Sequence, residues 1–135
     1  MKKVFKNYEI ENILGIMNDD RNFFRNTSVK LPAAFRHAMR INAKVLAARQ
    51  DIYNEERSEI INEHKEKEHL FISPDGNITY APGYKEKVFQ EINELAMVDN
   101  ELELEGITRN VADRVLDMDM SMAEEELIEL FIIPE

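Results

Sequence analysis

Residues 31–70 read LPAAFRHAMRINAKVLAARQDIYNEERSEIINEHKEKEHL, and this stretch decides the fold. Proline suits the first position of a helix, because its missing N–H would have no partner there. No further proline and no glycine follows Pro32 until Pro74. The stretch therefore predicts a helix over about residues 32–69, roughly 55 Å long at about 1.5 Å per residue. A compact domain of this size has a radius of gyration of only about 14 Å, so we expect this helix to break, to project or to pair with another copy.

The apolar side chains of the predicted helix share one broad face when residues are spaced by about 100°. They are Ala34, Phe35, Ala38, Ile41, Val45, Leu46, Ile52, Tyr53 and Ile60. Asn42, Arg49 and Glu56 follow each other at intervals of seven residues and fall near the centre of the same face.

The polar residues on this face have two interpretations. Arg49 and Glu56 either reach the rim while their stems cover apolar surface, or they are buried, paired groups that fix the register against another helix. On the second interpretation the candidate interface residues are Asn42, Arg49, Tyr53 and Glu56.

A basic stripe runs along the opposite side of the helix, where Arg36, Arg40 and Lys44 stand at i, i+4 and i+8. A solvated face is the favoured interpretation, and a surface that binds an anion or a partner is the alternative. Beyond Tyr53 the apolar signal thins, and residues 55–68 are mostly charged. We expect this distal half to be solvated or held by a partner.

The remaining chain predicts a mainly α fold with minor β-structure (α+β), arranged as a single domain over residues 1–135. Residues 2–6 favour a strand, and Asn7 favours the N-cap of a helix over residues 8–17. A β-hairpin is expected over residues 70–80 around Ser73-Pro74-Asp75-Gly76, followed by a helix over 84–97 that packs back on the long helix. Strict alternation predicts a strand over 101–107 with one acidic face. Ser121 and Glu124 form a capping box that opens a last helix.

Charge is distributed unevenly along the chain, whose net charge is −10. Residues 1–50 carry 10 Lys and Arg against 4 Asp and Glu, whereas residues 51–135 carry 7 against 23. The basic part can lie against the acidic part of the same chain or of the next one. Binding of nucleic acid is disfavoured, because a net-acidic protein repels phosphate.

The sequence holds no motif for catalysis, a metal, a cofactor or a phosphate loop, so we expect a protein that is not an enzyme. Its 135 residues include no cysteine and no apolar run of the roughly 20 residues that span a membrane. His64 and His69 are five residues apart, about 140° from alignment on a continuous helix, and make a poor metal pair.

Four segments together resemble short proteins of unknown function that are encoded by phages and prophages of Gram-positive bacteria. These segments are Asn7-Tyr8-Glu9-Ile10, Leu31-Pro32 through Arg40-Ile41-Asn42, Tyr53-Asn54-Glu55-Glu56-Arg57, and Leu127 to Pro134. The stretch from His64 to His69 and the hairpin depart from that pattern. The resemblance implies a setting in the cytoplasm of a phage host or in a virion, and it carries over no active site.

The leading expectation is a non-enzymatic phage protein that forms a homo-oligomer through its long helix and binds a host or phage protein. One alternative is an acidic inhibitor of a host defence system, acting as a nucleic-acid mimic or as an oligomer that captures a nucleotide. Another is a minor component of the virion or of its assembly.

Overall fold

The computed structural model describes residues 1–19 and 30–134 of the chain. The element order is β1 (Lys2–Lys6), α1 (Asn7–Met17), α2 (Ala33–Glu66), β2 (Leu70–Ile72), β3 (Ile78–Tyr80), α3 (Lys85–Ala96), β4 (Asp99–Glu103), α4 (Arg109–Leu116) and α5 (Met122–Leu130). The mainly α fold with minor β-structure is confirmed.

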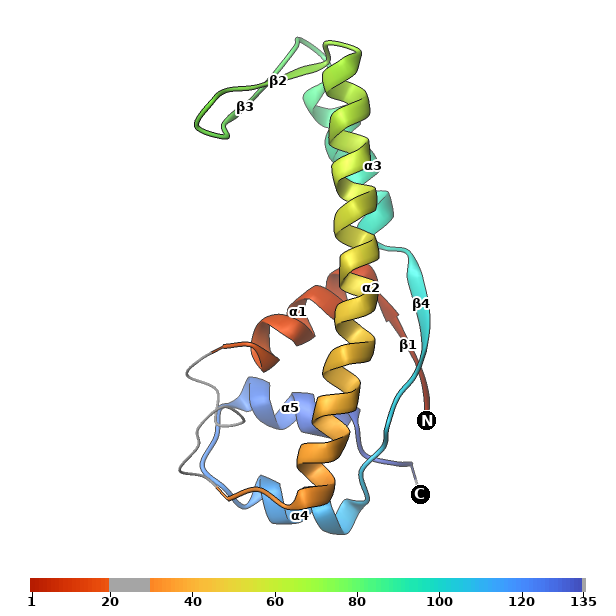
Figure 1. Cartoon of the computed structure of the whole chain (residues 1–135), viewed down its shortest axis with the longest axis vertical. Coiled ribbons are helices and arrows are strands. Elements are labelled where there is room, and N and C mark those ends of the chain that lie inside the picture. The colour runs from red at the N-terminus through yellow and green to blue at the C-terminus, as the bar shows by residue number, and fades with distance from the viewer. Residues whose placement is uncertain (20–29, 135) are drawn as a thin grey trace.

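The long helix α2 runs along almost the whole length of the molecule (Figure 1). Around its first half lie β1, α1, β4, α4 and α5, which we call the body (Figure 1). Its distal part, with the hairpin β2–β3 and α3, projects from the body, and we call residues 54–97 the arm. The expectation that the long helix projects is thus confirmed for its second half.

The apolar core lies in the body and gathers residues from both ends of the chain. Its side chains of less than 2% exposure are Ile10, Phe35, Ala38, Leu46, Ala112, Val115, Ile128 and Phe131. Ile52 was placed on the buried face by its periodicity, but its side chain is 49% exposed. The buried face of α2 is therefore narrower than the apolar stripe of the sequence.

Both termini of α2 differ slightly from the predicted range of 32–69. Pro32 lies just before the first helical residue, and the helix ends at Glu66. Glu68 then takes a positive φ of 61°, which reverses the chain into β2. The predicted hairpin forms, with Leu70 opposite Tyr80 and Ile72 opposite Ile78.

The last element of the arm is α3, which lies beside the distal half of α2 (Figure 1). The charged half of α2 therefore gains a neighbour from its own chain. Val88 of α3 and Leu70 of β2 are fully buried there. The predicted packing of the 84–97 segment on the long helix is confirmed.

The strand expected over residues 101–107 instead covers Asp99–Glu103 and pairs antiparallel with β1. Leu102 and Leu104 face the core, while Glu101 and Glu103 are exposed, as the alternation predicts. Ile107 lies outside this strand and forms an isolated parallel bridge with Ile132.

At this sheet, segments of opposite charge from one chain lie side by side. Lys6 of β1 pairs with Asp99 of β4 at 2.9 Å, and Lys2 lies 3.7 Å from Glu101. A basic amino-terminal strand thus lies against an acidic strand of the same chain, which is one of the two arrangements that the charge distribution allows.

Candidate functional site

Asn42 is fully buried in the body, where it binds the main chain just after β4. Its Nδ2 donates to the carbonyl of Glu105 at 2.9 Å, and its Oδ1 accepts from the Glu105 amide at 2.8 Å. Both polar groups of the amide are therefore satisfied by the same residue. These bonds join α2 to a segment of its own chain and not to another helix.

Tyr53 is also buried within the chain, since only 3% of its surface is exposed. The Arg57 guanidinium lies 4.6 Å from the centroid of its ring, an arrangement that attracts a cation to the ring face. Arg57 in turn lies 3.6 Å from Glu11 of α1. Tyr53 and Arg57 therefore join α2 to α1 at the base of the arm.

Arg49 and Glu56, the other two candidate interface residues, are both exposed. Neither takes part in an ion pair among residues 1–19 and 30–134. Ile52 lies between them on the same side of α2, and Ala48 one turn earlier is exposed as well. We call Ala48, Arg49, Ile52 and Glu56 the Ile52 flank, a small apolar surface with one charge of each sign.

The basic stripe of Arg36, Arg40 and Lys44 is exposed along the first half of α2. It continues toward the Ile52 flank, because Lys44, Ala48 and Ile52 again follow each other at intervals of four residues. Its three side chains are free to meet an anion or an acidic partner, the use that the sequence left open.

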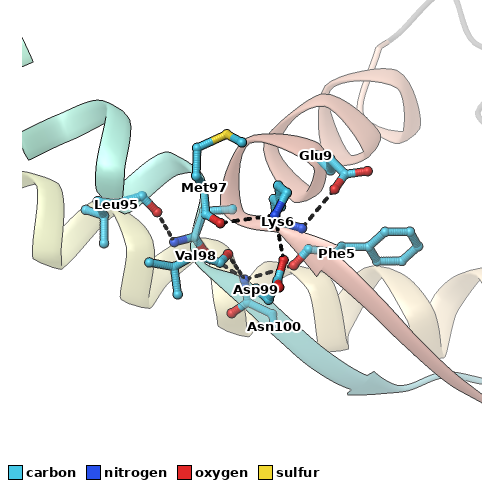
Figure 2. A network of polar contacts seen from close by, with 9 residues as sticks. Phe5, Lys6, Glu9, Leu95, Met97, Val98, Asp99 and Asn100 are labelled. Carbon is cyan, nitrogen blue, oxygen red and sulfur yellow. Dashed lines mark hydrogen bonds and ion pairs between the residues drawn. The ribbon is translucent and has the colours of Figure 1, made fainter. Parts of the chain in front are cut away.

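A polar network joins the arm to the body where α3 passes into β4 and β1 into α1 (Figure 2). Asn7 Nδ2 donates to the carbonyl of Leu95 at 2.8 Å, and the Asn7 main-chain N–H donates to that of Val98 at 3.1 Å. Asn100 Nδ2 donates to Asn7 Oδ1 at 2.9 Å. The prediction of Asn7 as an N-cap is wrong, because Asn7 is the first helical residue and its side chain serves this network.

Lys6 occupies the N-cap position of α1 and belongs to the same network. Its main-chain N–H donates to the Glu9 carboxylate at 3.0 Å, while its ammonium group binds Asp99 and the carbonyl of Met97 (Figure 2). The hydrogen bond to Asp99 raises the pKa of Lys6. The sequence offered no signal for this network, since it joins segments about ninety residues apart.

A histidine pair lies at the far end of the arm. His64 Nδ1 and His69 Nδ1 are 2.8 Å apart, and His64 Nε2 lies 3.1 Å from Glu91 Oε1 of α3. The His69 ring stacks on Tyr84 with centroids 3.8 Å apart. The expectation that the two histidines diverge is wrong, because it assumed a continuous helix whereas α2 ends at Glu66.

The pKa of His69 is lowered, chiefly because desolvation disfavours its charged form and next because His64 is so near. In the described part of the chain, no group of three or more His, Asp or Glu side chains is arranged to hold a metal ion. No helix of that part is long and apolar enough to cross a membrane.

The described residues therefore offer two exposed surfaces on α2, a polar junction and a histidine pair. Comparison of the chain with protein-family models, with curated proteins and with solved structures found no match.

Proposed function

We propose that this protein is a non-enzymatic binding protein that forms a homodimer by antiparallel packing of α2 on the α2 of a second copy. The observation that carries the proposal is the Ile52 flank, where a half-exposed isoleucine lies between an exposed cation and an exposed anion. A surface that is complementary to itself is what a two-fold interface requires.

The spacing of the two charges fits a two-fold axis at Ile52. Arg49 precedes Ile52 by three residues and Glu56 follows it by four. In an antiparallel pair centred on Ile52, the Arg49 of one copy and the Glu56 of the other lie at levels that differ by about 1.5 Å along the axis. Each dimer would contain two such pairs, and a parallel arrangement would contain none at this level.

The energetics of such an interface rest on Ile52 more than on the charges. Burial of a whole isoleucine side chain contributes roughly 1.5–3 kcal/mol, and Ile52 is still half exposed in a single chain. Exposed ion pairs contribute at most about 1 kcal/mol, but they select the partner and its orientation.

Light scattering coupled to size-exclusion chromatography tests the proposal. We expect a dimer for the natural sequence and a monomer for Ile52→Glu, because that change places two carboxylates on the two-fold axis. Met122→Glu is the matched control, since Met122 is 75% exposed at the start of α5, far from the flank in sequence, and should leave the dimer intact. A monomeric natural protein at hundreds of micromolar would refute the proposal.

A charge exchange tests the register itself. Arg49→Glu should weaken the dimer by placing like charges together, and so should Glu56→Arg. The double variant Arg49→Glu/Glu56→Arg should restore it, because each copy again presents both signs. Equal dimerisation of all three variants would rule out this register.

A second candidate function uses the acidic side of the arm to bind a basic protein in place of nucleic acid. Glu55, Glu59, Glu63 and Glu66 are all exposed on the distal half of α2. Such binding must weaken as salt rises. Glu59→Lys/Glu63→Lys should abolish the retention of a purified basic nucleic-acid enzyme at low salt, and unchanged retention would exclude this candidate.

The proposed setting is a phage or prophage, with action in the host cytoplasm or in the virion. The resemblance of the four sequence segments supports it. The neighbouring genes test the setting, and mass spectrometry of purified particles tests a place in the virion.

A further inference from the structure

The histidine pair at the end of the arm restricts where protons can reside. A hydrogen bond between two Nδ1 atoms 2.8 Å apart needs one N–H donor and one bare nitrogen. Two neutral rings can supply this pair, and so can one neutral ring and one imidazolium. Two imidazolium rings cannot, because both Nδ1 atoms would then carry hydrogen and both rings a positive charge.

Glu91 determines which arrangement is favoured. Its carboxylate accepts a hydrogen bond, so the Nε2 of His64 at 3.1 Å must carry a proton. The Nδ1 of a neutral His64 is then bare and accepts from His69, whereas a charged His64 donates at both nitrogens. The closed pair therefore lies two protons below the doubly charged pair when both rings are neutral, and one proton below it when His64 is charged.

The groups around the pair come from every element packed there. Glu91 and Lys87 belong to α3, Tyr84 precedes α3 and stacks on His69, and Lys67 follows α2. His64 is 7% exposed, so its ring cannot exchange its protein contacts for water without movement of the chain. Glu91 is the only anion among these neighbours, and it already serves His64.

The pair also lies where three elements meet. The His69 main-chain N–H donates to the carbonyl of His64 at 2.8 Å, and the Ala81 N–H after β3 donates to the carbonyl of His69 at 2.9 Å. Separation of the two rings therefore loosens the end of α2, the hairpin and the start of α3 together.

We propose that the contact between His64 and His69 is an acid-sensitive latch, which holds the hairpin and α3 on the end of α2 and opens when both rings are protonated. The latch lies within one chain and does not depend on the proposed dimer. Opening exposes Leu70 and Val88, the two buried apolar residues of the arm outside α2.

The direction with pH follows from linkage. A histidine whose pKa is lowered in the folded state contributes stability that is present above its unfolded pKa of about 6.5 and lost as pH falls. The lowered pKa of His69 thus agrees with a latch that is closed at neutral pH. Acidification therefore shifts the equilibrium toward the open form, which binds more protons than the closed form.

Hydrogen exchange on the full chain, kept dilute and corrected for intrinsic rates, tests the latch at about pH 7.5 and about pH 5. We expect protection of residues 64–92 to fall severalfold at the lower pH, while protection of β4 stays unchanged. His69→Gln, which cannot gain a charge, should abolish this pH response. His37→Gln is the matched control, because His37 is exposed in the first half of α2, and it should keep the response.

Two results would overturn the latch. One is an arm whose protection does not respond to pH in the natural sequence, and the other is a response that persists in His69→Gln. NMR titration of the natural protein gives a check that needs no variant. The two rings should take up their protons in two separate steps, whereas a single common step would refute the coupling.

Discussion

The body and the arm are built on the same helix, but they are stabilised in different ways. The body has one continuous apolar core to which α1, α2, α4, α5 and both strands of the β1–β4 sheet contribute. The arm buries only His64, Leu70 and Val88 among residues 54–97. Phe71, Ile72, Ile78, Phe89 and Met97, by contrast, are exposed there. The first half of α2 is therefore stabilised by an apolar core, and its second half by a single packed helix.

Segments with few buried apolar contacts open at lower free energy than the core of the same protein. The arm should therefore open without unfolding of the body, while the body unfolds only as a whole. The following substitutions test this division, in order of decreasing expected effect.

Removal of the amide of Asn42 should have the largest effect, although Asn42 is polar. Asn42→Ala leaves the N–H and the carbonyl of Glu105 without their partner beside a fully buried site. We expect a loss of about 2–4 kcal/mol in the free energy of unfolding, because each unsatisfied group costs about 1–3 kcal/mol. Urea denaturation measures it, and a loss below about 1 kcal/mol would mean that water replaces both bonds.

Two valines allow the same substitution to be compared in both regions, since Val115 in α4 and Val88 in α3 are each fully buried. Val115→Ala should lower the free energy of global unfolding by about 1.5–3 kcal/mol. Val88→Ala should leave global unfolding almost unchanged and speed hydrogen exchange in the arm alone. Equal global effects would show that arm and body unfold together.

Asn7 tests the junction between the regions and should give a smaller effect than Asn42 or Val115. Asn7→Ala removes the hydrogen bonds to Leu95 and Asn100, and we expect the free energy of unfolding to fall by about 1–2 kcal/mol. Asn7→Asp is the control that keeps the acceptor for Asn100 and loses the donor to Leu95. Exchange of the last turn of α3 should rise more in the alanine variant than in the aspartate variant, and an unchanged α3 would argue against a role in coupling.

The elements themselves could largely be predicted, because local signals carry them. The long helix, the hairpin around Ser73–Asn77, the helix of residues 84–97 and the capping box at Ser121 all follow from spacing and turn chemistry. The predicted capping box is present in full, since Ser121 accepts from the Glu124 N–H and Glu124 accepts from the Ser121 N–H.

The pairings between distant segments could not be predicted, because no local pattern records them. The lysines of β1 suit an acidic neighbour, but nothing in the residues of β1 singles out β4, so the contacts of Asn7 and Asn100 were not predicted. The partner of Asn42 was missed for the same reason, although its place on the apolar face of α2 was found. The contact of His64 with His69 forms because α2 ends at Glu66. In the sequence, the β-prone Leu70 indicates that the helix ends before this residue.

The candidate interface divides in a way that periodicity alone does not reveal. Asn42 and Tyr53 are buried by contacts within the chain, while Arg49, Ile52 and Glu56 are exposed. All of them lie near one apolar stripe, and only the positions of α1, α3 and the segment after β4 decide which part is covered. The exposed part is the one that the proposed dimer uses.

The pairing of β1 with β4 also has a consequence for synthesis on the ribosome. Lys6 is paired with Asp99 and Lys2 with Glu103, so β1 has no partner until nearly a hundred residues have followed it. At about 5–20 residues per second, β1 waits about 5–20 seconds for its neighbour. Lys2, Lys3 and Lys6 place three positive charges on this waiting strand, and lysine on an unpaired strand discourages association with other chains. The same charges that later meet the carboxylates of β4 thus protect the nascent chain before β4 exists.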